Sequence, residues 1–411
     1  MNFNSLALKI ASRCNLNCSY CFMYNLGDTT YKKQPKFMAS ETVDQIINKT
    51  KNYIQKYNKK EFSFIFHGGE PLLAPKSFYV DFMNKVEKIQ QELPNVSFYF
   101  DLQTNGVLLD KEWITLFKKL NISPSISVDG TKKAHDMYRV DHKGNGSYDD
   151  VFKSAKLLRK EMDFADIACV INIEESPQEI YNSFKKMNAS YVNFLIPDYT
   201  HDNFPFDKNK TAMADWLIEL FEIWIKDENR FKIPIFLGLL NSLMRLQENT
   251  KNESTVLVIE TNGEIEAIDS LKACGHGFTK TGLNIKNNDF DDIQNTSLGN
   301  LYFNDFTKKL SNQCMECPLK EVCKGGRLVH RFSKENGFNN SSVYCNDLIK
   351  LIAHVQKFFI SCYPELHKQE EIEPINPQEI RTYLNSLSTS SSLSNAELEF
   401  FSQKNQMEAH F

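Results

Sequence analysis

Residues 11–24 read ASRCNLNCSYCFMY, and this stretch determines how the rest of the chain is interpreted. Its three cysteines have the spacing Cys14-x3-Cys18-x2-Cys21. Three thiolates can hold three irons of a [4Fe–4S] cube and leave the fourth iron open to a substrate or cofactor. A structural zinc site would require a fourth Cys or His close by, and no His lies between Cys14 and His67. The spacing therefore favours an open iron–sulfur cluster over a zinc knuckle or three core thiols.

The composition is that of a soluble globular protein with more than one domain. The 411 residues are enough for two or three domains that each bury a core. A formal charge of −4 is small for this length, so no general affinity for nucleic acid is implied. No run reaches the ~20 apolar residues of a membrane span, and the N-terminus has no signal-peptide pattern. Ten cysteines without a secretion signal predict a cytoplasmic protein whose thiols bind metal.

Apolar runs of strand length alternate with helical patterns over the first 226 residues. The runs lie at 6–10, 62–66, 96–102, 125–128, 167–173 and 192–196. The helical patterns lie at 40–57, 77–93, 111–120, 147–162, 177–187 and 211–226. Six such βα units predict parallel strands with crossover helices, as in a partial TIM-like barrel or a doubly wound sheet. The positions of the polar motifs decide for the barrel, because barrels place their chemistry on loops after the strands.

Polar motifs follow the second, third and fourth of these runs. HGGEP at 67–71 has two glycines that let backbone approach a ligand, and a carboxylate that can hold an ammonium group. Alone, this motif is also typical of a turn followed by a helix start. QTNG at 103–106 has the composition of a turn as well. SVDG at 127–130 precedes Arg139, whose planar fork can clamp a carboxylate or form a surface ion pair.

In this order behind the three-cysteine loop, the motifs resemble the core of the radical S-adenosylmethionine (AdoMet) enzymes over residues 1–230. The resemblance implies a partial (β/α)6 barrel, a [4Fe–4S] cluster on Cys14, Cys18 and Cys21, and AdoMet chelating its open iron. It also implies the AdoMet contacts: Gly68, Gly69 and Glu70 at the methionyl amine, Ser127 and Arg139 at the ribose and carboxylate, and Tyr20 and Leu195 at the adenine. A core leucine is an equally good interpretation of Leu195.

A second set of cysteines follows in residues 231–350. A helical bridge at 231–250 leads to a hairpin, signalled by Asn262-Gly263 between two alternating runs at 255–260 and 264–268. Four cysteines can saturate a cube or bind zinc, and here they are Cys314, Cys317, Cys323 and Cys345. The region resembles the SPASM extension of radical AdoMet enzymes that modify peptides, and this resemblance favours a second [4Fe–4S] cluster over zinc.

The SPASM resemblance is incomplete. The full pattern has seven cysteines and two auxiliary clusters, and this chain has Arg327 and Ile268 where two of those ligands would stand. One auxiliary cluster is therefore expected to be lost, which leaves two [4Fe–4S] clusters in the whole chain. Cys274 is off register and is interpreted as a structural thiol. His276 is interpreted as a loop residue, with a metal ligand as the alternative.

Asp269 is the predicted catalytic residue. In sulfatase-maturing relatives the matching aspartate serves as a base near the substrate, whereas the alternative is a turn aspartate that caps a helix. Its apolar neighbour Ile268 is expected to raise the pKa of the carboxyl toward the working range of a general base. Residues 272–285 resemble maturases that form cyclophanes in ribosomal peptides.

The resemblance predicts a radical AdoMet oxidoreductase that joins an aromatic residue to a nearby side-chain β-carbon of a precursor peptide. The expected partners are that peptide and a flavodoxin- or ferredoxin-type electron donor. Three alternatives stay open: a thioether-forming maturase, a sulfatase-maturing oxidase, and a non-catalytic iron–sulfur or zinc scaffold. The missing auxiliary ligands argue against the sulfatase-maturing oxidase, which needs the full set.

The predicted domains are the radical AdoMet core at 1–230, the bridge and reduced SPASM region at 231–350, and a C-terminal extension at 351–411. That extension is predicted to be helical to about residue 363, because an acidic, proline-bearing linker and a Ser-rich tract at 386–394 follow. The rest is predicted to be a flexible tail with one or two short helices that carries no chemistry. No winged-helix segment precedes Cys14, so leader capture is expected to use another surface or a partner.

Overall fold

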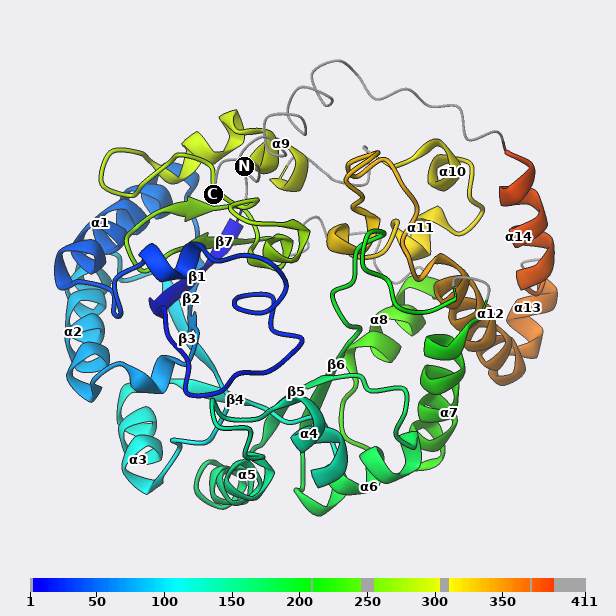
Figure 1. Ribbon diagram of the computed structural model, residues 1–411, viewed down its shortest axis with the longest axis horizontal. Helices are drawn as coiled ribbons and strands as arrows, with labels where there is room; N and C mark the ends of the chain where they lie inside the picture. Colours follow the sequence, from blue (N-terminus) through cyan, green and yellow to red (C-terminus); the bar gives the residue numbers. More distant parts are fainter. Residues whose placement is uncertain (1–2, 208–209, 245–254, 304–309, 370–371, 388–411) are drawn as a thin grey trace. The chain divides into compact units, whose positions relative to one another are not determined.

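The computed structural model describes residues 3–207, 210–244, 255–303, 310–369 and 372–387 (Figure 1). The chain forms two compact units. The first contains residues 1–170, 184–191 and 252–304, and the second contains 171–183, 192–251 and 305–411. The domain boundaries expected at 230 and 350 stay a prediction. The end of the helical bridge at 245–250 and the Ser-rich tract from 388 lie outside the described residues.

A parallel sheet forms the centre of the first unit. Its strands pair in the order β5-β4-β3-β2-β1-β7-β8, and all neighbours are parallel except β7 and β8. Their bounds are β1 (Phe3–Ala11), β2 (Glu61–Gly68), β3 (Ser97–Thr104), β4 (Ser123–Ser127), β5 (Asp166–Val170), β7 (Thr255–Ile259) and β8 (Ile265–Glu266). The predicted α/β fold with parallel strands is confirmed, as is the hairpin around Gly263, whose φ of +85° suits glycine.

Helices connect these strands and lie on the outer side of the sheet (Figure 1). They are α1 (Ser40–Tyr57), α2 (Lys76–Glu92), α3 (Lys111–Leu120) and α5 (Tyr148–Met162). The unit also contains α4 (Lys132–Tyr138), in the loop between β4 and α5, and α9 (Ser297–Phe303), which follows β8. Short 3-10 helices are η1 (Thr30–Lys33), η2 (Pro71–Leu73), η3 (Asp269–Cys274) and η4 (Phe290–Asn295). The sequence patterns did not predict the α4 and α9 helices.

The alternation of β2 explains which side chains enter the core. Phe62, Phe64 and Phe66 are fully buried, while the residues between them are less buried and lie on the opposite face. The rings of Phe64 and Phe66 pack edge-on against Phe82 of α2, with centroids 5.1 and 5.0 Å apart. Such pairs add ~0.5–1.5 kcal/mol each beyond area burial. The same alternation places His67 on the face opposite to these rings.

The second unit is mostly helical. Its elements are β6 (Tyr191–Leu195) and α6 (Pro177–Lys186) at the unit boundaries, and α7 (Ala212–Lys226), α8 (Pro234–Leu243), α10 (Asn312–Met315), α11 (Lys320–Cys323), η6 (Leu328–Arg331), α12 (Cys345–Cys362), α13 (Pro364–Gln369) and α14 (Pro377–Ser386). A small core joins Ile349 and Ile352 of α12 to Leu319 and to Leu384 of α14. The C-terminal α14 therefore packs on the segment that carries the second set of cysteines.

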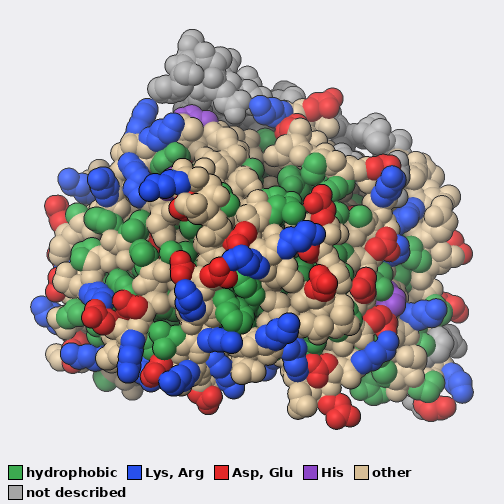
Figure 2. Space-filling view, turned by 60° about the horizontal axis from the view of Figure 1, so that its bottom comes forward, with side chains coloured by type: hydrophobic (Ala, Val, Ile, Leu, Met, Phe, Trp, Pro, Cys, Tyr) green, Lys and Arg blue, Asp and Glu red, His purple; other side chains and the backbone are tan. Residues whose placement is uncertain are grey.

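Charged side chains of both signs are mixed on the surface. In Figure 2 the basic and acidic groups alternate over the face that is shown. Several form exposed ion pairs, such as Lys132 with Asp149 and Lys76 with Glu112. Such exposed pairs are screened by solvent and contribute little to stability. Within the described ranges, no helix combines the length and the apolar character needed to cross a membrane.

Candidate active site

The three-cysteine loop leaves the carboxyl end of β1 directly. The backbone N–H of Met38 donates to the carbonyl of Ile10 at 2.9 Å, and that of Cys21 donates to Cys18 at 3.0 Å. The first bond fixes the end of the strand, and the second closes a tight turn between two of the thiols. Cys14, Cys18 and Cys21 are all half-buried. The fold therefore holds the three predicted ligands together at one edge of the parallel sheet.

The surroundings of these thiols suit an iron–sulfur cluster. The N–H of Leu16 lies 3.4 Å from Cys14 Sγ, and Asn105 Nδ2 lies 3.6 Å from the same atom. Burial raises the pKa of Cys14 to about 12, to which the nearby Glu70 charge contributes, and raises that of Cys21 to about 11. Iron and N–H donors both stabilise a buried thiolate. Among the described residues, no three Cys, His, Asp or Glu side chains converge closely enough to bind one metal ion. A [4Fe–4S] cube does not require such convergence, because each thiolate binds a different iron.

Gly68 and Gly69 let the loop after β2 pack onto the backbone of the cysteine loop. A Cβ at Gly68, whose φ is +141°, would lie 2.2 Å from the carbonyl oxygen of Ala11. One at Gly69 would lie 2.0 Å from the Tyr24 hydroxyl. The Gly69 N–H donates to Ala11 at 2.7 Å, so the approach is stabilised by a hydrogen bond. The glycines are thus required by backbone packing, and their contact with AdoMet stays a prediction.

Glu70 is fully buried and connects two loops. Its carboxylate accepts hydrogen bonds from Thr104 Oγ1 at 2.7 Å, from the Asn105 N–H at 2.8 Å and from the Leu72 N–H at 2.9 Å. Burial raises its pKa to about 7, although these donors oppose the rise. Because Leu72 belongs to η2, Glu70 is also the cap of that short helix. The predicted contact with the methionyl amine is untested.

Arg139 lies in a buried ion pair. Its Nε donates to Asp129 Oδ2 at 2.8 Å, and its guanidinium lies 5.4 Å from the centre of the Tyr20 ring. The Tyr20 hydroxyl donates to the same carboxylate. The ion pair that one interpretation predicted is therefore present, but it is buried rather than on the surface. Burial raises the pKa of Cys18, and Arg139 opposes that rise.

The other two predicted AdoMet contacts lie on different units. Ser127 ends β4, and its hydroxyl accepts a hydrogen bond from Gln103 Nε2 at 2.9 Å. Leu195 ends β6 in the second unit. The positions of Ser127 and Leu195 alone do not establish a contact with AdoMet, so both contacts stay predictions.

Lys9 and His67 are site residues that the motifs did not predict. Lys9 lies on β1 directly beside His67 of β2, and its side chain is fully buried. Its Nζ lies 3.0 Å from His67 Nδ1 and pairs with the Asp269 carboxylate. The same ammonium lies 5.7 Å from the ring centre of Phe22, the residue after Cys21. The sequence contained one signal for this pair, a lysine inside the apolar run of β1, because a buried lysine requires a charged or hydrogen-bonding partner.

The charge state of Asp269 differs from the expectation. Burial opposes ionisation, but Lys9, His67 and the more distant Lys272 outweigh it and hold the pKa of Asp269 well below its usual range. The predicted rise in pKa is therefore wrong, because an ammonium rather than Ile268 dominates the surroundings. The alternative as a helix cap is wrong as well, since Ile268 is the N-cap of η3 and Asp269 is its first residue.

An ion network holds the segment in which the auxiliary cluster was expected to be lost. Lys272 Nζ lies 2.9 Å from Glu266 Oε2, 3.1 Å from Glu260 Oε1 and 3.6 Å from Asp28 Oδ2, and all four side chains are buried. His276 accepts a hydrogen bond from the Thr29 N–H at 3.2 Å, which is consistent with a loop residue. These contacts join the β7–β8 hairpin and the segment after it to the loop that follows the cysteines.

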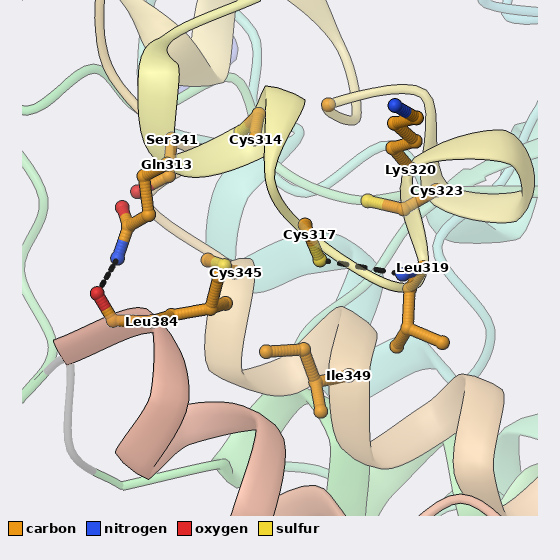
Figure 3. A pocket seen from close by; sticks show the side chains of 11 residues that line it. Gln313, Cys314, Cys317, Leu319, Lys320, Cys323, Ser341, Cys345, Ile349 and Leu384 are labelled. Atoms are coloured by element: carbon orange, nitrogen blue, oxygen red, sulfur yellow. Dashed lines mark hydrogen bonds between the residues drawn. The ribbon is translucent and has the colours of Figure 1, made fainter. Parts of the chain in front are cut away.

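The second set of cysteines lines one pocket of the second unit (Figure 3). Cys314 lies on α10, Cys323 ends α11 and Cys345 begins α12, with Cys317 between the first two helices. The Leu319 N–H lies 3.4 Å from Cys317 Sγ. Burial raises the pKa of Cys323 to about 11, while the backbone N–H groups of Gly325 and Gly326 oppose that rise. The four predicted ligands are thus brought together with N–H donors, as at the first site.

Arg327 is occupied by other contacts within its unit. Its Nη1 lies 2.6 Å from Asp198 Oδ1 and donates to the carbonyl of Ile196 at 3.2 Å. Cys274, which was expected to be a structural thiol, is buried at the end of η3. Both observations fit the expectation that neither residue replaces a missing cluster ligand.

Comparisons with known proteins agree with this geometry. Residues 8–186 match the Radical SAM superfamily. A cysteine-type anaerobic sulfatase-maturating enzyme of Clostridium novyi is 29% identical over 83% of this chain and 92% of its own length. A serine-type anaerobic sulfatase-maturating enzyme of Bacteroides thetaiotaomicron is 26% identical over 88% of this chain and 91% of its own. A solved structure of anSMEcpe with AdoMet and the Kp18Cys peptide is 25% identical, with a TM-score of 0.74 over 87% of this chain and 98% of that one.

These matches decide the coarse predictions. The radical SAM fold is confirmed, and so is the assignment to radical SAM enzymes, which use a [4Fe–4S] cluster and AdoMet. The cyclophane-forming type is not supported by the relatives, whose names favour the alternative of a sulfatase-maturing oxidase.

Proposed function

We propose that this radical SAM enzyme oxidises a Cys or Ser side chain of a peptide or protein substrate to an aldehyde. The observation that carries the proposal is the extent of the similarity to two sulfatase-maturating enzymes, over 83% and 88% of the chain. The match is longer than the barrel alone and extends into the region of the second cysteines. A cytoplasmic setting with a flavodoxin- or ferredoxin-type donor is part of the proposal, because free thiol ligands persist in a reducing compartment.

The cysteine sets would hold the cofactors. Cys14, Cys18 and Cys21 would bind the first cluster, and the four thiols of Figure 3 a second one. When bound, AdoMet and the first cluster supply the 5′-deoxyadenosyl radical that removes a hydrogen atom from the substrate carbon. The proposed AdoMet contacts are those of the resemblance, at Tyr20, Gly68, Gly69, Glu70, Ser127, Arg139 and Leu195. In the first unit, the Glu70 hydrogen bonds and the Asp129–Arg139 pair keep these loops in place.

We assign the role of proton acceptor to Asp269. The oxidation removes two hydrogens from the substrate. After the first hydrogen atom has been abstracted, the substrate radical must still lose one electron and one proton. The Lys9 ammonium pairs with Asp269 Oδ2 and keeps the carboxylate ionised. The lysine side chain is fully buried, whereas 21% of that of Asp269 is exposed, so the carboxylate is the accessible member of the pair. The four thiols of the second cysteine set would hold an iron–sulfur cluster, which would supply an acceptor for the electron.

A carbon–carbon crosslink is the second candidate function. The observation that favours it is that Arg327 and Ile268 stand where the SPASM pattern has two cluster ligands. Arg327 is instead ion-paired with Asp198. A crosslink also removes two hydrogens from the peptide, so it requires the same hydrogen abstraction and the same proton acceptor. The products differ, because only the sulfatase-type reaction yields an aldehyde.

The test uses the reconstituted chain with AdoMet, a reductant, and synthetic peptides that carry Cys, Ser or Ala at the target position. Oxidation of Ser removes two hydrogens and gives the aldehyde directly. Oxidation of Cys removes two hydrogens and gives a thioaldehyde, which water converts to the aldehyde with release of hydrogen sulfide. The proposal predicts a hydrazide-reactive product with Cys or Ser and none with Ala. A product that has lost two hydrogens but does not react with hydrazide would contradict the proposal and support the crosslinking function. AdoMet cleavage without any change in these peptides or in an aromatic precursor peptide contradicts both functions.

A further inference from the structure

The pocket of the second cysteine set is lined without carboxylates. Its described lining consists of the four cysteines and Gln313, Leu319, Lys320, Gly325, Ser341, Ile349 and Leu384 (Figure 3). The one charged side chain among them is Lys320, whose Nζ donates to the Met315 carbonyl at 3.1 Å. Two guanidinium groups lie just behind this lining.

Arg331 lies behind Gly325 and is fully buried. A Cβ built on Gly325 would lie 3.7 Å from Arg331 Cδ and 3.9 Å from its Nη1. Its Nη2 donates to the Phe338 carbonyl at 3.0 Å, which fixes the guanidinium. Cys314 and Cys323 lie within electrostatic range of this guanidinium. The guanidinium is thus held close to two of the four thiols.

Arg381 approaches the pocket from α14. Its Nη2 donates to the carbonyl of Asn346 at 3.0 Å, and Asn346 is the residue after Cys345. Leu384, one helical turn further on, forms part of the pocket wall. Gln313 Nε2 lies 3.5 Å from the Leu384 carbonyl, and Figure 3 shows this contact closing one side of the pocket. The C-terminal helix therefore covers the thiols and brings a positive charge to them.

We propose that Arg331 and Arg381 are the countercharges of the second iron–sulfur cluster and raise its reduction potential. The inference rests on the second cluster of the proposed function. A cube on four thiolates is an anion in both redox states and becomes more negative when it is reduced, so nearby cations stabilise the reduced state more strongly. The higher potential makes the cluster an acceptor for the electron that the substrate radical releases.

The test is a redox titration of the full chain followed by EPR. The parent carries Cys14→Ala, Cys18→Ala and Cys21→Ala, so that the second cluster alone contributes to the signal. Arg381→Gln should make reduction less favourable by about tenfold, which is ~59 mV for a one-electron couple. Arg331→Gln should act in the same direction and more strongly, because Arg331 is fully buried. Arg381→Lys keeps the charge and should restore most of the potential.

Lys357→Gln is the matched control. It removes one exposed positive charge from α12, about 18 Å along the helix from Cys345 at 1.5 Å per residue. It should leave the midpoint near that of the parent. An Arg381→Gln protein that keeps its iron and the parent midpoint overturns the inference while leaving the second cluster in place. A parent without iron overturns the second cluster and the inference with it. The Arg381 series decides the question even if Arg331→Gln does not fold.

Discussion

The two sets of cysteines share their ligand chemistry and differ in the charges around them. Near the first set, the Glu70 carboxylate raises the pKa of Cys14 beyond the effect of burial, while at Cys18 the Arg139 guanidinium, which is paired with Asp129, opposes the rise. Near the second set, the charges are those of Arg331 and Arg381. Carboxylates disfavour an added electron and guanidinium groups favour it. The guanidinium groups near the second set fit its proposed role as the electron acceptor.

The two sites also differ in the number of ligands. Three thiols leave one iron of a cube available to a cofactor, whereas four thiols saturate it. The first set lies at the carboxyl edge of a parallel sheet, beside Lys9 and Asp269, where barrels place their chemistry. The second set is closed by α14. Each prediction below tests one consequence of these differences.

The largest expected effect comes from removing one ligand at each site. Cys18→Ala should reduce AdoMet cleavage to background, because the cofactor pair supplies the hard chemical step. Cys317→Ala should keep AdoMet cleavage and lose oxidised peptide. The measurement is 5′-deoxyadenosine and peptide product from the same reaction. Equal loss of 5′-deoxyadenosine in both variants, with both proteins folded, would remove the distinction between the sites.

Glu70 should make the stability of the apo protein depend on pH. Burial raises its pKa from an ordinary 4.5 to about 7, so the folded chain binds a proton that the unfolded chain has released. Its contribution to the free energy of unfolding is complete below pH ~4.5 and falls by about 3 kcal/mol as the pH rises to 7. Denaturant unfolding of Glu70→Gln against the parent, from pH 4.5 to 7.5, should show a difference that changes with this sign. A constant difference across that range contradicts the assignment.

Asp269→Asn should separate AdoMet cleavage from product formation. It removes the proton acceptor and keeps the shape, so product should fall ~100-fold, as for a positioned base. Because the pKa of Asp269 is lowered, product formation in the parent should also show no step from this residue between pH 5 and 8. The ratio of aldehyde to 5′-deoxyadenosine measures both effects. Asp291→Asn, which breaks a surface pair with Lys56, is the control. An unchanged ratio in Asp269→Asn would assign the residue a structural role.

The smallest effect is expected at Cys274. Its thiol is buried at the end of η3 and is not one of the predicted cluster ligands. Cys274→Ala should keep the iron content and both activities, and lose about 1 kcal/mol of stability from the smaller side chain. Iron analysis and thermal unfolding measure this. Loss of about half the iron would instead make Cys274 a ligand and end the division into a three-thiol and a four-thiol site.

Local patterns predicted much of this structure because their causes are local. The apolar run at 62–66 predicted a strand, and the cysteine spacings predicted two sets of metal-binding thiols. The Lys9–Asp269 pair joins residues 260 positions apart, so its effect on the pKa of Asp269 depends on how β1 and η3 meet. Arg381 lies in a C-terminal segment expected to carry no chemistry, and α14 brings it to Cys345 only in the folded chain. The sequence predicted most strands and helices, but it could not predict these long-range contacts between charged side chains.

Iron analysis with Mössbauer spectroscopy on the anaerobically reconstituted chain tests the two-cluster account most directly. The intact chain should hold about eight irons, and Cys14→Ala/Cys18→Ala/Cys21→Ala about four. A variant with Ala at Cys314, Cys317, Cys323 and Cys345 should also hold about four irons. AdoMet should change the Mössbauer spectrum of this second variant and leave that of the first variant unchanged. About twelve irons in the intact chain, or zinc in place of iron at the second set, would contradict the account.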